Sequence, residues 1–369
     1  MTDSAPLAPP SGPARDGLPP VAPVVPRRSS WTPPPKRGLL PLRPIAFGAI
    51  LGAPFRLQRR SPHTTLAPAL VVSLVATVLA DVLRWLLVVG PQAALDASYY
   101  QDYAIASNLL GVAGAVAWWV PLVLALPATA LLAGPVVIAA SRSLLAERVS
   151  FRGVRWRLTG RVGSLVAWTA IVLLAGAAVL AVAAIPPLLV APTSTMGGFF
   201  AFLVALVEVP LLLLAGGYVA ARLGFTAHAI ALEGLRLRAA VRRSWSLTRR
   251  AGMRLLGSTL LIWTIVGLGT WVFTQPVGWA FDLGGGLIFP NGATSAQGQL
   301  YDSIRAVALI AASALAGAFG LVVQSVTAAL LYLDQRMRVE GLDLVLARYV
   351  DDRQRGATVA DPFPGGGGR

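Results

Sequence analysis

Six long stretches of mostly apolar residues divide the chain, and each is long enough to cross a lipid bilayer. A helix needs about 20 consecutive apolar residues to span the hydrocarbon layer. Six segments meet this length: 66–90, 109–140, 163–190, 198–221, 255–276 and 304–333. We therefore predict an all-α fold: a polytopic membrane bundle of about six transmembrane helices, with amphipathic interfacial helices on its cytoplasmic face.

The second apolar stretch is long and contains Pro121, Pro127 and Pro135. Proline removes a backbone hydrogen bond and bends or breaks a helix. The stretch is therefore either one kinked, tilted helix or a span followed by a broken piece, and it is counted once.

The arginines alternate with the apolar stretches in a way that predicts an orientation. They concentrate in the segments 27–60, 142–161, 222–254 and 336–355, whereas the loops 91–108, 191–198 and 277–303 contain none. Basic loops stay on the cytoplasmic side of a membrane. Six spans then alternate without conflict, so we expect a multi-pass protein of the bacterial cell (inner) membrane with both termini in the cytoplasm.

Composition divides the chain into three regions. Residues 1–41 are rich in proline and are expected to form a disordered cytoplasmic arm. That arm is either a Pro-rich ligand for a partner domain or a plain solvated tail, and the second interpretation is favoured. Residues 42–350 are expected to form the six-helix membrane domain, and residues 351–369 a flexible C-terminal tail.

A loose pentapeptide recurs in each of the four basic segments. Its form is a charge, any residue, an aliphatic residue, any residue, and then Phe or Leu; the four copies are 43–47, 147–151, 233–237 and 340–344. This recurrence predicts three units, each an interfacial helix followed by a helical hairpin, and then a fourth terminal interfacial helix. Two spans per unit would give all units the same orientation, unlike the inverted repeats of many transporters.

The third basic segment is the most clearly amphipathic. At the helical period, Leu237, Ala240, Val241, Trp245 and Thr248 share one face. The arginines of the other face and the tryptophan at headgroup depth are candidate contacts for lipid headgroups; they are Arg236, Arg238, Arg242, Arg243, Trp245, Arg249 and Arg250. The alternative is that these arginines only keep the loop inside, and it is the favoured one. Membrane lipids, in particular anionic ones, are the expected partners.

Ionisable residues within spans are expensive and point to either function or packing. Asp81 and Arg84 can pair within the first span, and Glu208 in the fourth span has no local partner. Arg84 is a candidate partner for Glu208 across helices. The three residues form either a polar site for a headgroup or proton, or a tie that fixes packing. His228 is expected to be merely solvated at the end of the fourth span.

The residue types that usually carry chemistry are scarce in this sequence. It has no cysteine and only two histidines, so thiolate chemistry is excluded and a His-based metal centre is disfavoured. Walker loops, nucleophile elbows and zinc motifs do not occur. We expect no catalytic residue, no metal and no cofactor. The net charge is +15, and the arginines that carry it lie mostly between the apolar spans. This placement favours a lipid surface over nucleic acid as the partner of the basic residues.

Several stretches resemble the membrane domain that is associated with glycerophosphodiester phosphodiesterases and also occurs in stand-alone bacterial multi-pass proteins. They are 42–47 with 54–60, Ala239-Ala-Val-Arg-Arg-Ser-Trp-Ser-Leu-Thr-Arg249, and 329–338 running into 340–344. The resemblance covers about 42–350 and implies a membrane module without the catalytic barrel, because the His-Arg pair of that barrel is absent.

Three functions remain open at this point. The first is a non-enzymatic membrane protein that organises or senses anionic lipid. The second is a transporter or lipid-moving protein that uses Asp81, Arg84 and Glu208. The third, ranked lowest, is an enzyme of lipid or glycerophosphodiester metabolism, because no acid-base or metal constellation is present.

Overall fold

The computed structural model describes residues 47–60, 62–96, 103–145, 147, 150–194, 196–290, 292, 294–355, 359 and 361–363. All of them belong to the unit that runs from Arg37 to Arg369. These described residues form helices and connecting turns without any strand, which confirms the predicted all-α class. The predicted N-terminal arm, 1–41, lies outside the described residues.

Among the described residues, six helices have the length and apolar composition of membrane spans, which confirms the predicted number. They are α2 (Pro62–Asp96), α3 (Tyr103–Leu144), α5 (Val162–Val190), α6 (Gly197–Leu223), α9 (Gly252–Ile288) and α10 (Ser295–Glu340). Their outward faces carry large apolar side chains: Leu174 is 68% exposed and Phe202 is 61% exposed. Such a surface is compatible with lipid and costly in water.

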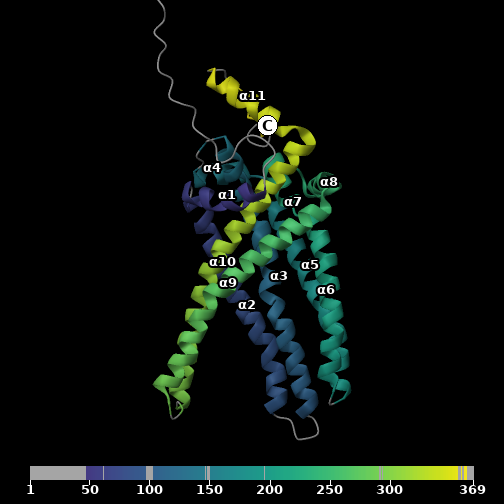
Figure 1. The fold of residues 1–369 in the computed structure, drawn as a ribbon, viewed down its shortest axis with the longest axis vertical. Coiled ribbons are helices and arrows are strands. Elements are labelled where there is room, and N and C mark those ends of the chain that lie inside the picture. Colours follow the sequence, from purple (N-terminus) through teal and green to yellow (C-terminus); the bar gives the residue numbers. More distant parts are fainter. Residues whose placement is uncertain are drawn as a thin grey trace, which may run out of the picture. The chain divides into compact units, whose positions relative to one another are not determined.

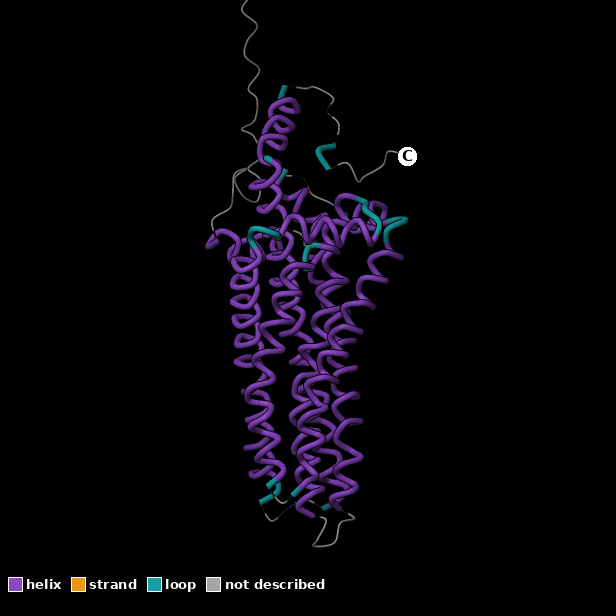
Figure 2. Tube along the Cα trace, turned by 90° about the vertical axis from the view of Figure 1, so that its right-hand side faces the viewer, coloured by secondary structure: helices purple, strands orange, loops and turns teal. Residues whose placement is uncertain are grey.

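The five shorter helices occupy the arginine-rich segments and gather at one end of the long helices (Figure 1). They are α1 (Phe47–Arg60), α4 (Phe151–Leu158), α7 (Thr226–Glu233), α8 (Leu237–Thr248) and α11 (Leu342–Gln354). We call this the arginine-rich end. In Figure 2 the long helices extend away from this end, and Figure 1 shows that the far ends of α9 and α10 diverge from those of α2 and α3.

The order of the helices matches the predicted three units. The hairpins α2–α3, α5–α6 and α9–α10 each consist of two packed helices, and they follow α1, α4 and α8 in turn. Each pentapeptide ends at the start or in the first turn of α1, α4, α8 or α11. The helix α7, which precedes α8, is an addition that the pattern did not predict.

The second span is one continuous helix despite its three prolines. At 1.5 Å per residue, the 42 residues of α3 extend about 63 Å, which is twice the thickness of the hydrocarbon layer. It packs against α2, α5, α7 and α10 and carries buried residues from Ala106 to Leu144. Neighbouring helices can accommodate the backbone groups that prolines free within a bundle.

Small residues bring α10 close to its neighbours. A Cβ atom added at Gly317 would lie 2.5 Å from Ser73 Oγ on α2, and one added at Gly320 would lie 2.5 Å from Val266 Cγ1 on α9. Close backbone approach at small residues is typical of helix packing in membranes, where the solvent is as apolar as the side chains. The centre of the bundle is therefore formed by α3 and α10.

Two glycines end helices at the arginine-rich end. Gly234 and Gly341 have φ angles of +70° and +65°, a left-handed conformation that favours glycine, and they cap α7 and α10. Each follows a glutamate and precedes a leucine: Leu342 begins α11, whereas Leu235 lies in the short link before α8. The Glu-Gly-Leu part of the third and fourth pentapeptides therefore encodes a helix end followed by a new helix.

Packed residues continue beyond residue 350, where we expected the flexible C-terminal tail to begin. The helix α11 continues to Gln354, and Asp361 and Phe363 pack against the arginine-rich end. The physical reason is the burial of Phe363, which is only 2% exposed. This one apolar side chain holds a segment whose composition otherwise resembles that of a solvated tail.

Candidate lipid-binding surface and the polar network beneath it

The helix α8 is amphipathic, but its less polar face packs against protein rather than lipid. Ala240, Ser244, Leu247 and Thr248 are buried. Ser244 Oγ accepts a hydrogen bond from the Phe225 backbone N–H at 3.2 Å and donates one to the Arg222 carbonyl at 2.7 Å. These bonds fix α8 to the turn that follows α6. The less polar face of α8 is therefore a contact with protein.

Trp245 does not belong to the buried face. It is 46% exposed, and the guanidinium of Arg222 lies 5.0 Å from the centre of its ring. Arg222 also donates to the hydroxyl of Tyr218 through Nε at 3.1 Å and Nη2 at 2.7 Å. Small residues form the face of α8 that contacts protein, and the large ring of Trp245 remains outside that face, next to a cation.

Five of the six predicted arginines project away from the protein. Their side chains are exposed, and their guanidinium groups make no ion pair or hydrogen bond with any described residue; they are Arg236, Arg238, Arg242, Arg249 and Arg250. We call these five residues, together with Trp245, the α8 surface. Unpaired guanidinium groups are suited to phosphate because their planar donors match its oxygens.

Arg243 differs from the other five and does not face outward. Its guanidinium donates to both oxygens of Glu233 at 3.0–3.3 Å and also pairs with Glu340. Arg336 donates to Glu340 at 2.9 Å and lies 3.6 Å from Glu233. The hydroxyl of Tyr332 donates to Glu233 as well. Together these five residues form the Glu233 network, so the prediction of a lipid contact is not supported for Arg243.

The Glu233 network outweighs the effect of partial burial on Arg243. Burial by itself lowers the pKa of the Arg243 guanidinium, but the hydrogen bonds and charges of Glu233 and Glu340 outweigh it and hold the pKa above its ordinary value. The network joins α7 and α8 to α10. It therefore holds the α8 surface at a defined position on the bundle.

The glutamates of three pentapeptides all become ion-pair acceptors. Glu147 accepts from Arg142 at 3.2 Å and from Arg353, just as Glu233 and Glu340 accept from the arginines of the Glu233 network. The glutamate that recurs in three pentapeptides was the sequence signal for these ion pairs. Its partners come from helices distant in the chain, so their identity was not readable from the pattern.

His228 lies inside the protein, which overturns the expectation that it is merely solvated. It is 2% exposed, and its ring stacks on Tyr332 with centroids 5.6 Å apart. Its Nδ1 lies 3.1 Å from the Gly224 carbonyl, and Phe225 packs edge-on against it. The two aromatic residues come from α10 and from the turn before α7, so tertiary packing buries a residue that hydropathy placed at the surface.

A second polar cluster ties the C-terminal segment to α3 and α4. Asp361 accepts from Arg142 and, at 3.2 Å, from Arg157, and the ring of Phe363 lies 5.8 Å from the Arg142 guanidinium. Burial alone raises the pKa of Asp361, but the hydrogen bonds from Arg142 and from the Phe363 backbone N–H outweigh it and hold the pKa below its ordinary value. Because the folded-state pKa is lowered, this stabilisation is present at neutral pH and is lost only as the pH falls below that value.

The predicted intramembrane polar site is not assembled. Arg84 Nη1 lies 3.8 Å from Asp81 Oδ1, and both side chains are about two-fifths exposed on α2. Glu208 on α6 has a buried Oε2 without a hydrogen-bond partner among the described residues. The suggested pair between Arg84 and Glu208 is not formed among the described residues. Arg84 lies beside Asp81 instead, one turn away on the same helix.

Comparison with protein-family models, with curated proteins and with solved structures found no match. The described residues establish a multi-pass membrane protein with six apolar helices and a surface of exposed arginines on a short, firmly held helix.

Proposed function

We propose that this protein binds anionic lipid headgroups through the α8 surface and acts as a non-catalytic organiser or sensor of such lipids. The observation that carries the proposal is the contrast among the α8 arginines. Arg243 is neutralised by two carboxylates, whereas the five outward-facing guanidinium groups have no acidic partner among the described residues.

The contrast favours a binding role over an orienting role alone. Orientation requires only that positive charge remain on one side of the membrane. The arginines of the α8 surface are also fixed in place, because the Glu233 network and Ser244 hold their helix in one position. Each basic side chain near an anionic leaflet contributes about 1 kcal/mol of attraction, and a fixed array avoids part of the ordering cost.

The proposal also covers the orientation of the protein in the membrane and its resemblance to a known membrane domain. The arginine-rich end would face the cytoplasm, where anionic lipids concentrate. Residues 42–350 resemble the membrane domain associated with glycerophosphodiester phosphodiesterases, and this resemblance is consistent with a lipid-directed role. We propose that the chain is related to that domain and lacks the catalytic barrel.

Native mass spectrometry of the full chain released from neutral detergent tests the proposal. We expect more retained phosphatidylglycerol than phosphatidylcholine. Replacing Arg238, Arg242 and Arg249 together with glutamine should weaken the phosphatidylglycerol preference by up to about a hundredfold at low salt, from about 1 kcal/mol per arginine.

The matched control removes three other exposed arginines of the same end: Arg152, Arg155 and Arg348. It should retain most of the preference, because these residues do not belong to the α8 surface. An equal loss in both triple variants would mean that diffuse charge, rather than the α8 surface, attracts the lipid, and the proposal would fail.

A transporter or lipid-moving protein is the second candidate, and one observation favours it. The buried Oε2 of Glu208 lies within a span and lacks a hydrogen-bond partner among the described residues. Buried carboxylates of this kind occur on ion pathways. The candidate ranks second because Asp81 and Arg84 pair with each other and do not extend a polar route to Glu208.

A further inference from the structure

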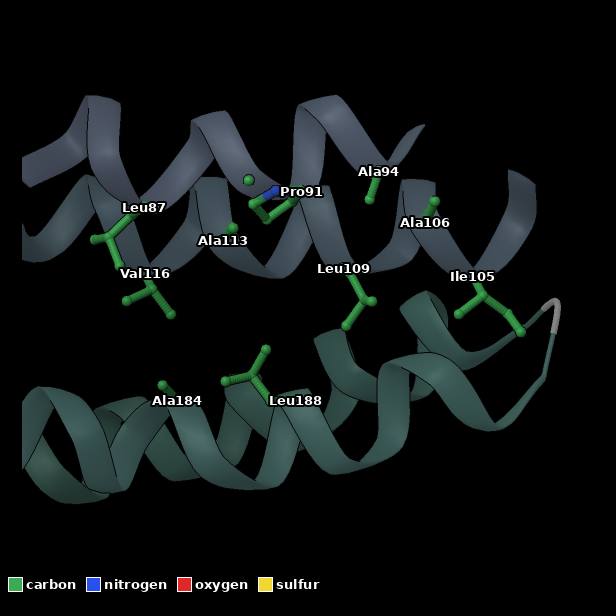
Figure 3. A pocket seen from close by; sticks show the side chains of 11 residues that line it. Leu87, Pro91, Ala94, Ile105, Ala106, Leu109, Ala113, Val116, Ala184 and Leu188 are labelled. Carbon is green, nitrogen blue, oxygen red and sulfur yellow. The ribbon is translucent and has the colours of Figure 1, made fainter. Parts of the chain in front are cut away.

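A cavity of about 670 Å³ lies between α2, α3 and α5. In Figure 3, Leu109 and Val116 of α3 point toward Ala184 and Leu188 of α5 across the open space. The cavity adjoins the C-terminal part of α2, the N-terminal part of α3 and the C-terminal part of α5. These helix ends are joined by loops without arginine, so the cavity lies away from the α8 surface.

The lining of this cavity has one chemical character. It consists of leucine, isoleucine, valine, alanine, glycine and proline, and no lining side chain offers a hydrogen-bond donor or acceptor. Water needs two to four polar partners to occupy a buried site. The volume lies within the usual range of about 300–1,000 Å³ for ligand sites. A polar ligand would therefore lose its hydrogen bonds there, whereas a hydrocarbon chain would lose none.

Small residues create the space, and a tether keeps it open. Gly90 and Ala94 on α2, Ala113 on α3 and Ala184 on α5 all line it, and a Cβ atom added at Gly90 would meet nothing within 4 Å. Beside the cavity, the amide of Asn108 donates to the carbonyls of Ala191 and Ser194, both at 3.2 Å. This tether fastens α3 to the turn after α5 and fixes the separation of the two walls.

We propose that this cavity binds a single hydrocarbon chain of a membrane lipid. The occupant is argued from the medium: the three lining helices are membrane spans, so the apolar solute that reaches the opening is a lipid chain. The neighbouring loops have no arginine, so selection acts on the chain and not on an anionic headgroup. The site is independent of the α8 surface and of the function proposed for it.

Photolabelling of the full chain in nanodiscs tests this site. The probe is a phosphatidylcholine with a diazirine in its acyl chain, present as a minor fraction of the lipid. We expect labelling of the cavity segments 87–94, 105–116 and 184–188 in addition to the exposed face of α6. The variant Gly90→Phe places a ring in the cavity and should abolish labelling of the cavity segments while the α6 face remains labelled.

The control is Gly114→Phe, the same substitution at an exposed position of α3 that does not line the cavity and is equally open. It should leave cavity labelling unchanged. If Gly90→Phe fails to fold, Ala113→Phe fills the cavity from α3. Cavity labelling that survives in a folded filling variant, or that never exceeds labelling of the α6 face, would show ordinary lipid contact only and overturn the proposal.

Discussion

Replacing Glu233 with glutamine should destabilise the folded protein by about 3 kcal/mol, the cost of removing one member of a buried ion pair. The side chain of Glu233 is 14% exposed and accepts from Arg243 and Tyr332. Glutamine keeps the shape but removes the charge. Among the described residues, the partly buried guanidinium groups of Arg243 and Arg336 then retain Glu340 as their one carboxylate partner.

Urea unfolding of the full chain in mixed micelles measures this effect. The control is Asp352→Asn, which removes a carboxylate of α11 that lies 3.5 Å from Arg355 and is well exposed. A solvent-exposed pair of this kind contributes at most about 1 kcal/mol. If Glu233→Gln costs no more than Asp352→Asn, the Glu233 network does not hold α7, α8 and α10 together.

Alanine at Gly197 should also cost about 3 kcal/mol, because it overpacks a backbone contact that cannot yield. A Cβ atom at this position would lie 2.1 Å from the carbonyl oxygen of Ala191 and 2.8 Å from that of Val190. Both are main-chain oxygens: Val190 is the last residue of α5, and Ala191 begins the turn that leads to α6. The substitution must therefore shift the helix ends that Asn108 tethers.

The matched control for Gly197→Ala lies on the same helix. Gly216 is open, with nothing within 4 Å of an added Cβ atom. Alanine there should stabilise the helix by up to about 1 kcal/mol through its higher helix propensity. Thermal unfolding in detergent should show opposite signs for the two variants; a neutral Gly197→Ala would mean that the turn is looser than the structure shows.

The spans and the starts of the short helices could be predicted because they depend on local signals. Length and hydropathy are sufficient for a helix surrounded by lipid. The recurring pentapeptide also located the starts of α1, α4, α8 and α11. The prolines of α3 were ambiguous, because whether a helix continues through proline depends on the neighbours that surround it.

The interior of the arginine-rich end could not be predicted because its contacts join segments distant in the chain. His228 is buried by Tyr332, about a hundred residues later, and Arg243 is neutralised by Glu340. A helical wheel shows which residues share a face but not which face meets protein.

Cysteine accessibility in intact cells tests the central claim, a six-span bundle with its arginine-rich end in the cytoplasm. The sequence has no cysteine, so single cysteines report without background. A membrane-impermeant maleimide should label cysteines placed at the exposed positions Ala93, Ser194 and Ala296. It should reach cysteines at Ser246 and Asp351 only after permeabilisation. Labelling of Ser246 or Asp351 in intact cells, with protection of the other three, would contradict the claim.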